Sequence, residues 1–227
     1  MDMGPTIREI LPLAIGVAIS PIPIIAVILM LFGPKARRTG PAFALGWVGA
    51  LLLVGGIVLI VADGGDISTD EAASDAVYWS KLLLGLLFLA LAIRQWRSRP
   101  KEGEEPEMPK WMSAIDQFTP GRAFGLAGLL AGVNPKNLGL TLAAGTTIAQ
   151  AGLAGGENWL ALIVFVALAS VSVATPVVYY LVASASAEHT LNAMKAWLLA
   201  NNATVMFVLF LILGVKLIGD GLGSLTS

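Results

Sequence analysis

The chain has 227 residues, of which 56% are hydrophobic and only 13% are charged. A soluble domain carries about twice that share of charged residues, so the composition indicates an integral membrane protein and excludes a soluble one. The formal net charge of −1 points to no particular partner, and the absence of cysteine excludes disulfides and thiolate metal sites.

The apolar segments predict an all-α integral membrane protein with six transmembrane helices, since each span needs roughly 20 residues. The N-terminal segment lacks a basic cluster and a cleavage site of small residues, so we expect it to stay in the protein rather than act as a signal peptide. The predicted spans are residues 7–32, 41–62, 77–96, 121–150, 158–183 and 198–219.

The first predicted span is interrupted near its middle by Ser20, Pro21 and Pro23. Proline has no backbone donor, clashes with the preceding turn and biases the residue before it away from helical geometry. We therefore expect a broken helix here, with backbone carbonyls freed at membrane depth.

A charged stretch with four prolines follows the third span, at about residues 97–122. Mixed charge and proline are typical of solvated connectors, although a docking site for a partner is the alternative. The predicted organisation is a first three-helix half at 1–97, a cytoplasmic linker at 98–120 and a second half at 121–227. Residues 112–118 are a candidate for a short interfacial helix.

The fourth predicted span contains Asn134, Pro135, Lys136 and Asn137, and Lys136 is the only charge between Ala123 and Ala149. A charge at bilayer depth costs several kcal/mol unless it is paired or hydrated, so it is a functional-site candidate by default. A structural kink with a lysine that snorkels to the interface is the alternative. Two matched broken helices, one in each half, indicate a transporter binding site.

Hydroxyl side chains extend this polar pattern at helical spacing. Thr141 continues a stripe from Asn134 and Asn137, while Ser172, Thr175 and Tyr179 form a second stripe in the fifth span, followed by Pro176 as a third candidate kink. Such hydroxyls commonly bond to their own backbone or to a neighbouring helix, and a cavity-lining role is the alternative. Asn201 and Asn202 are candidates for a cap at the start of the sixth span.

Ten basic residues lie in or beside the odd-numbered loops, against three near the opposite ends of the spans. By the positive-inside rule the odd-numbered loops are cytoplasmic and both termini are outside. Two halves of three helices then enter from opposite faces, as a 3+3 inverted-topology repeat with broken helices 1 and 4. At 1.5 Å per residue, Ser20 and Asn134 both lie about 20 Å deep, near the midplane.

The paired motifs Ile19-Ser20-Pro21-Ile22-Pro23 and Gly132-Val133-Asn134-Pro135-Lys136-Asn137, with the charged central linker, resemble the lysine-exporter (LysE) superfamily. The closer resemblance is to its GAP family of actinobacterial membrane proteins that address peptidoglycolipids or sulfolipids. It covers nearly the whole chain. It implies export or translocation of cell-envelope glycolipids, in a multi-pass actinobacterial plasma membrane protein.

These observations lead to the hypothesis of a translocator for an envelope lipid or lipid-linked glycan, in which Lys136 and the amides around it hold an anionic head group. An exporter of an amino acid or other small solute is the alternative, and a non-transporting accessory subunit of a lipid-export machine is another. The residues expected at the substrate site are Ser20, Pro21, Pro23, Asn134, Pro135, Lys136, Asn137, Thr141, Thr175 and Tyr179.

We expect no enzyme activity, because the sequence contains no GxSxG or HExxH motif and no paired carboxylates within a span. The single histidine, His189, falls in a predicted cytoplasmic loop without a second ligand, so no metal or cofactor is expected. Expected partners are membrane lipids and the transported molecule. A homodimer and partner proteins of lipid export remain open, and nucleic acid is not expected.

Overall fold

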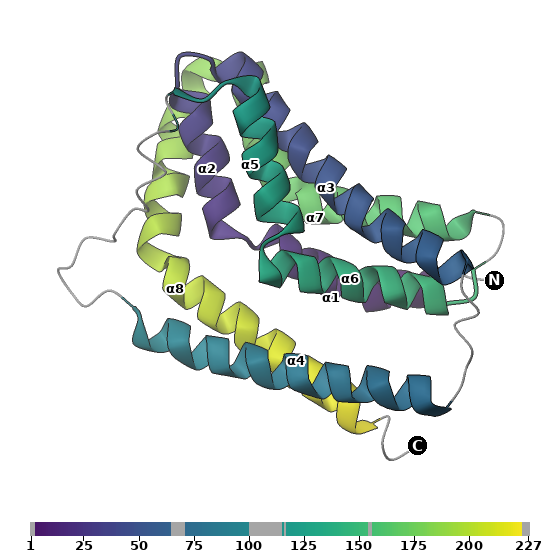
Figure 1. The fold of residues 1–227 in the computed structure, drawn as a ribbon. Coiled ribbons are helices and arrows are strands. Elements are labelled where there is room, and N and C mark those ends of the chain that lie inside the picture. The colour runs from purple at the N-terminus through teal and green to yellow at the C-terminus, as the bar shows by residue number, and fades with distance from the viewer. Residues whose placement is uncertain (1–2, 65–70, 100–114, 116, 154–155, 224–227) are drawn as a thin grey trace. The chain divides into compact units, whose positions relative to one another are not determined.

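The computed structural model describes residues 3–64, 71–99, 115, 117–153 and 156–223 (Figure 1). Over these residues the fold is all-α, as predicted, with eight α-helices and no strand. The helices are α1 (Gly4–Ala18), α2 (Pro21–Phe32), α3 (Ala36–Gly64), α4 (Glu71–Arg97), α5 (Pro120–Gly132), α6 (Pro135–Gln150), α7 (Glu157–Val182) and α8 (Ser184–Gly223).

Several of these helices are long and apolar enough to cross a membrane. Three segments of the described chain qualify on their own: Ala36–Ala62 in α3, Glu157–Val182 in α7 and Ser186–Gly219 in α8. The pair α1 and α2, bent by 53° at its break, qualifies as a fourth if it counts as one span. The length and composition of these helices indicate a membrane protein. The six spans and the inverted repeat stay a prediction.

The chain folds into two compact units, one made of Met1–Gly64 with Glu107–Leu199 and the other of Gly65–Pro106 with Ala200–Ser227. Each unit takes segments from both of the predicted halves. The division at 1–97 and 121–227 stays a prediction, as does the linker at 98–120, of which residues 100–114 and 116 lie outside the described chain. The proposed interfacial helix at 112–118 falls largely outside it as well.

In the first unit, α3 and α7 pack against each other around large buried side chains such as Phe43, Trp47 and Phe165. Gly40 of α3 lies against Val177, and Gly55 lies against Leu162. Since the numbers rise along one helix as they fall along the other, the two helices are antiparallel. The α1 helix packs on α7 and α6, and α2 packs on α3 and α7.

The helices α5 and α6 run along α3 in a single direction. Gly46 of α3 lies against the Phe124 backbone, Gly132 lies against Ala50, and Gly145 lies against Val58. Residue numbers therefore rise together on α3 and on the pair α5 and α6, so this pair advances along α3 and does not double back at its break. Glycine at Gly46 and Gly145 leaves room for this close approach, as is common between helices in lipid.

In the second unit, α4 packs against the C-terminal part of α8. Gly85 lies against Gly214 and Ile218, and Gly221 lies against Leu82, which makes this pair antiparallel as well. Aromatic contacts extend it, with ring centroids 5.5 Å apart for Phe88 and Phe210 and 4.7 Å apart for Trp96 and Phe207. Small residues at the crossing again bring the two backbones close.

Two predictions about the last helix are wrong. The predicted loop at 184–196 is helical, because α8 begins at Ser184 and continues to Gly223. Asn201 and Asn202 therefore lie inside α8 and not at a helix start. The segment 184–196 has polar side chains but no proline or glycine, so nothing in it stops a helix. Pro176 lies inside α7, and the candidate kink there stays a prediction.

Candidate functional site

The break between α1 and α2 follows from two prolines. Ser20 is extended, with φ −125° and ψ 90°, and Pro21 takes the first position of α2. In a continuous helix, the carbonyls of Val17 and Ile19 would accept from the residues four positions later. Those residues are Pro21 and Pro23, which have no N–H. The sequence therefore leaves the last carbonyls of α1 in need of other donors.

Each of the last four carbonyls before Ser20 has a donor. Gly16 O and Ile19 O accept from Lys136 Nζ at 2.8 and 3.0 Å. Val17 O accepts from Ser20 Oγ at 2.7 Å. Ala18 O accepts from Ser20 N at 2.9 Å and from Ser172 Oγ at 2.6 Å. Lys136, Ser20 and Ser172 thus supply the donors that the prolines remove from this end of α1.

Lys136 is buried, with 6% of its surface exposed, and its ammonium has three acceptors. The third is Ser20 Oγ, 2.6 Å from Nζ. All three acceptors are neutral, and no carboxylate of the described chain bonds to this lysine. A cation at the C-terminal end of α1 is favoured by the helix dipole, but the part of the chain that the structure describes provides no counter-ion for its charge.

The second break lies beside the first, as Figure 1 shows where α5 meets α6. The α5 helix ends at Gly132 and α6 begins at Pro135, with Asn134 as the cap whose Oδ1 accepts from Lys136 N at 3.0 Å. Asn137 is fully buried and donates from Nδ2 to Leu130 O at 2.9 Å, and its Oδ1 lies 3.1 Å from Ser20 Oγ, whose single hydrogen it shares with Val17 O. One hydrogen-bonded network therefore joins both breaks, and we call it the junction: Gly16–Ser20, Asn134, Lys136, Asn137 and Ser172.

A family model described as Sap, sulfolipid-1-addressing protein, matches residues 10–223. The chain belongs to this family. The matched range includes both breaks and the whole junction, and it confirms the resemblance to the sulfolipid-addressing proteins. No curated protein and no solved structure matches the chain. The wider link to the lysine exporters stays a resemblance.

Within this member of the family, the predicted site residues fall into three groups. Ser20, Lys136 and Asn137 meet in the junction, with Asn134 as its cap. Pro21 and Pro23 are buried in the first turn of α2, and Pro135 is exposed in the first turn of α6. The others lie apart from the Lys136 ammonium: Thr141 Oγ1 donates to Asn137 O of its own helix, Thr175 is exposed, and Tyr179 shares side-chain hydrogen bonds with Ser186 and Thr190.

The sequence predicted freed carbonyls at the first break and named Ser20, but it did not pair any of these acceptors with Lys136. Two of them are backbone carbonyls, of Gly16 and Ile19, and a carbonyl has no signature in the sequence beyond the prolines that free it. Ser172 was part of a predicted polar stripe but was not among the expected site residues. Of that stripe, it is the residue whose hydroxyl bonds to the junction. The sequence shows only a hydroxyl in an apolar span. The packing of α7 on α1 is what brings this hydroxyl to Ala18 O.

Proposed function

We propose that this protein moves an envelope lipid with an anionic head group across the membrane, and that Lys136 binds the head group. The observation that carries the proposal is a buried ammonium bonded only to neutral acceptors. A charge in this setting is costly, and an anion is the ligand that would neutralise it. Membership of a family named for addressing a sulfolipid supports an anionic lipid as the cargo.

The geometry suggests how binding would act on the fold. In the described state the ammonium is fully used by Gly16 O, Ile19 O and Ser20 Oγ. A sulfate or phosphate oxygen is a stronger acceptor than a neutral carbonyl or hydroxyl. An arriving head group would therefore draw Lys136 away from α1, and the released carbonyls would loosen the contact between the two breaks. In this proposal the substrate opens the junction by replacing its bonds.

Exposed apolar residues in and beside the junction favour a lipid over a small solute. Ile15 is 48% exposed, Ile19 is 40% exposed, and Val133 is 62% exposed. Because these residues flank the acceptors of Lys136 and the second break, a head group can approach while its acyl chains remain against the outside of α1 and α5. An amino-acid exporter would need a closed polar cavity instead.

The directions of the helices support the predicted crossing. Since α5 and α6 advance along α3 together, they suit one broken span better than a re-entrant hairpin. Together with α1 and α2 this gives one broken span in each half, the arrangement in which transporters form a binding site from half-helix ends. The six-span inverted repeat is proposed on this ground.

Reconstitution tests the role of Lys136. Purified protein in vesicles is given a fluorescent glycolipid with a sulfate head group, and arrival in the opposite leaflet is measured with a membrane-impermeant quencher. Lys136→Ala and the longer neutral Lys136→Met should slow transport by about 10- to 100-fold, the loss expected for a hydrogen bond to a charged group. Lys136→Arg should retain part of the activity, and Lys136→Glu should be worse than Lys136→Ala.

Lys35→Ala is the matched control, since Lys35 is an exposed lysine outside the junction. Thermal stability is measured on every variant, because a lysine of purely structural value would change stability and transport together. Full transport by a folded Lys136→Ala protein would refute the proposal. Transport of an uncharged glycolipid is measured as well. If Lys136→Ala slows it as much as it slows transport of the sulfated glycolipid, Lys136 does not act through the charge of the cargo.

A further inference from the structure

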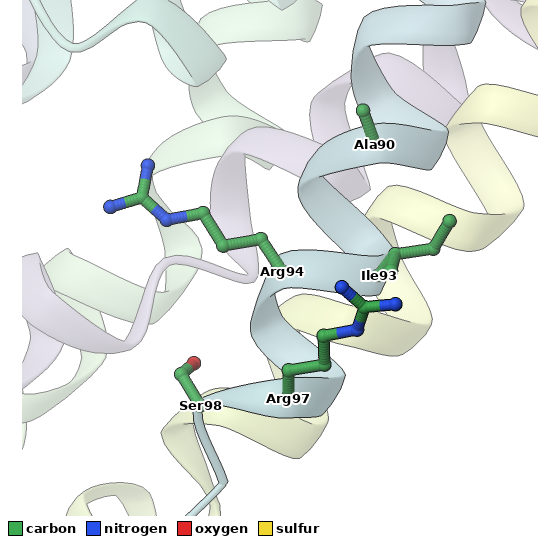
Figure 2. Close-up of a pocket in the computed structure, with 5 residues that line it drawn as sticks. All are labelled: Ala90, Ile93, Arg94, Arg97 and Ser98. Carbon is green, nitrogen blue, oxygen red and sulfur yellow. The ribbon is translucent and has the colours of Figure 1, made fainter.

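A shallow depression with a volume of about 390 Å³ follows one face of α4 near its C-terminal end (Figure 2). Five residues line it: Ala90, Ile93, Arg94, Arg97 and Ser98. They are spaced by three and four positions, so they form a single helix face. All of them belong to the second compact unit, whereas Lys136 and its acceptors belong to the first.

This face changes from apolar to cationic within two helical turns. Ala90 and Ile93 come first, with Ile93 54% exposed, and the exposed guanidinium groups of Arg94 and Arg97 follow. Trp96 lies at the same level, is 46% exposed, and carries the Arg99 guanidinium 3.1 Å from its ring centroid. Tryptophan and arginine together are typical of the boundary between hydrocarbon and head groups.

Among the described residues, no carboxylate pairs with the two guanidinium groups of the depression. No Asp or Glu occurs between Leu82 and Arg99 in the sequence. Arg94 and Arg97 have no hydrogen bond or ion pair with any residue of the described chain. Guanidinium binds phosphate through paired N–H groups, and it is less strongly hydrated than an ammonium, which suits a site at the membrane surface.

We propose that this face binds an anionic phospholipid, with the phosphate held by Arg94 and Arg97 and an acyl chain lying along Ile93 and Ala90. The apolar half of the face distinguishes a lipid from a free phosphate, for which Ile93 would offer nothing. If the predicted orientation holds, the site faces the cytoplasmic leaflet, where anionic lipids attract basic residues. The site does not depend on the proposed role of Lys136.

Native mass spectrometry of the detergent-solubilised full chain tests the proposal by titration with phosphatidylglycerol and phosphatidylcholine. The wild type should retain one phosphatidylglycerol at least tenfold more tightly than phosphatidylcholine. The double variant Arg94→Gln with Arg97→Gln should weaken phosphatidylglycerol binding by roughly 30-fold and leave phosphatidylcholine unchanged, as two basic residues at a membrane surface would. Arg37→Gln with Arg38→Gln is the control, because it removes two exposed arginines from the start of α3.

Three results would overturn the proposal. One is unchanged phosphatidylglycerol binding by the Arg94 and Arg97 variant, and another is an equal loss in the Arg37 and Arg38 control, which would indicate a general effect of net charge. The third is displacement of the lipid by millimolar inorganic phosphate, which would assign the site to a free anion. If the double variant does not fold, the preference of the wild type for phosphatidylglycerol over phosphatidylcholine is measured at low and high ionic strength. A preference that does not weaken at high ionic strength is not electrostatic and would also overturn the proposal.

Discussion

Ser20→Ala is the substitution that should weaken the junction most clearly without touching a charge. The Ser20 hydroxyl accepts from Lys136 Nζ at 2.6 Å and lies 2.7 Å from Val17 O and 3.1 Å from Asn137 Oδ1. Alanine removes all of these contacts. The ammonium is then left with two acceptors in a buried site, and Val17 O loses its only donor, because Pro21 has no N–H.

The expected size follows from these contacts. A hydrogen bond to a charged group contributes about 1.5–3 kcal/mol, and a neutral one between membrane helices contributes about 0.6 kcal/mol on average. Their sum predicts that Ser20→Ala lowers the free energy of unfolding by roughly 2–4 kcal/mol. Ser172→Ala should lower it by only about 0.5–1 kcal/mol, since Ala18 O keeps its bond from Ser20 N.

Ser170→Ala provides the matched control. Ser170 is on α7, is 5% exposed, and its hydroxyl has no hydrogen-bond partner in the described structure. The same substitution there should be neutral or should stabilise by up to about 1–2 kcal/mol, because it removes a buried group with no partner. Reversible unfolding in mixed micelles with increasing sodium dodecyl sulfate measures all three. A Ser20→Ala protein as stable as Ser170→Ala would refute the view that the junction stabilises the fold.

Two further predictions concern packing and topology. Gly46→Ala should destabilise the protein by about 1–3 kcal/mol, because a Cβ there would overlap the Phe124 backbone. Gly49→Ala on the same helix is the control, since a Cβ there meets nothing within 4 Å and should be tolerated. Equal stability of the two variants would contradict the observed approach of α3 to α5. Single cysteines at Ser98 and Gln150 should react with an impermeant thiol reagent from the cytoplasmic and the outer side respectively, and labelling of both from one side would contradict the six-span orientation.

The breaks in the helices could be predicted because proline acts locally. Pro21, Pro23 and Pro135 determine where α2 and α6 begin, whatever packs around them. Lys136 could be singled out as a candidate site residue for a similar reason, since it is the only charged residue in its apolar segment. The arrangement of these features in space could not be predicted in the same way, since the three acceptors of Lys136 lie at the break after α1, between 116 and 120 positions earlier in the chain.

Polar residues outside the breaks gave weaker predictions. Residues 184–196 contain Glu188, His189 and Lys195, which suggested a loop, but a polar helix at the end of a span has the same composition. Thr141 and Tyr179 illustrate a related difficulty. A hydroxyl in an apolar helix bonds to whichever acceptor is nearest, and for Thr141 this is Asn137 O in its own helix. Helical spacing alone cannot separate such a residue from Ser172, which bonds across to α1.

Under the proposed function, the junction would let the protein select its cargo by charge. Withdrawing the Lys136 ammonium from its three acceptors forfeits about 1.5–3 kcal/mol for each bond. A head group with several anionic oxygens can replace those bonds, whereas an uncharged head group replaces them only in part. Opening would then be coupled to an anionic cargo by the same contacts that close the resting state. It follows that a weakened junction opens more readily for every lipid, so the loss of stability in Ser20→Ala should be accompanied by a smaller difference in transport between sulfated and uncharged glycolipids.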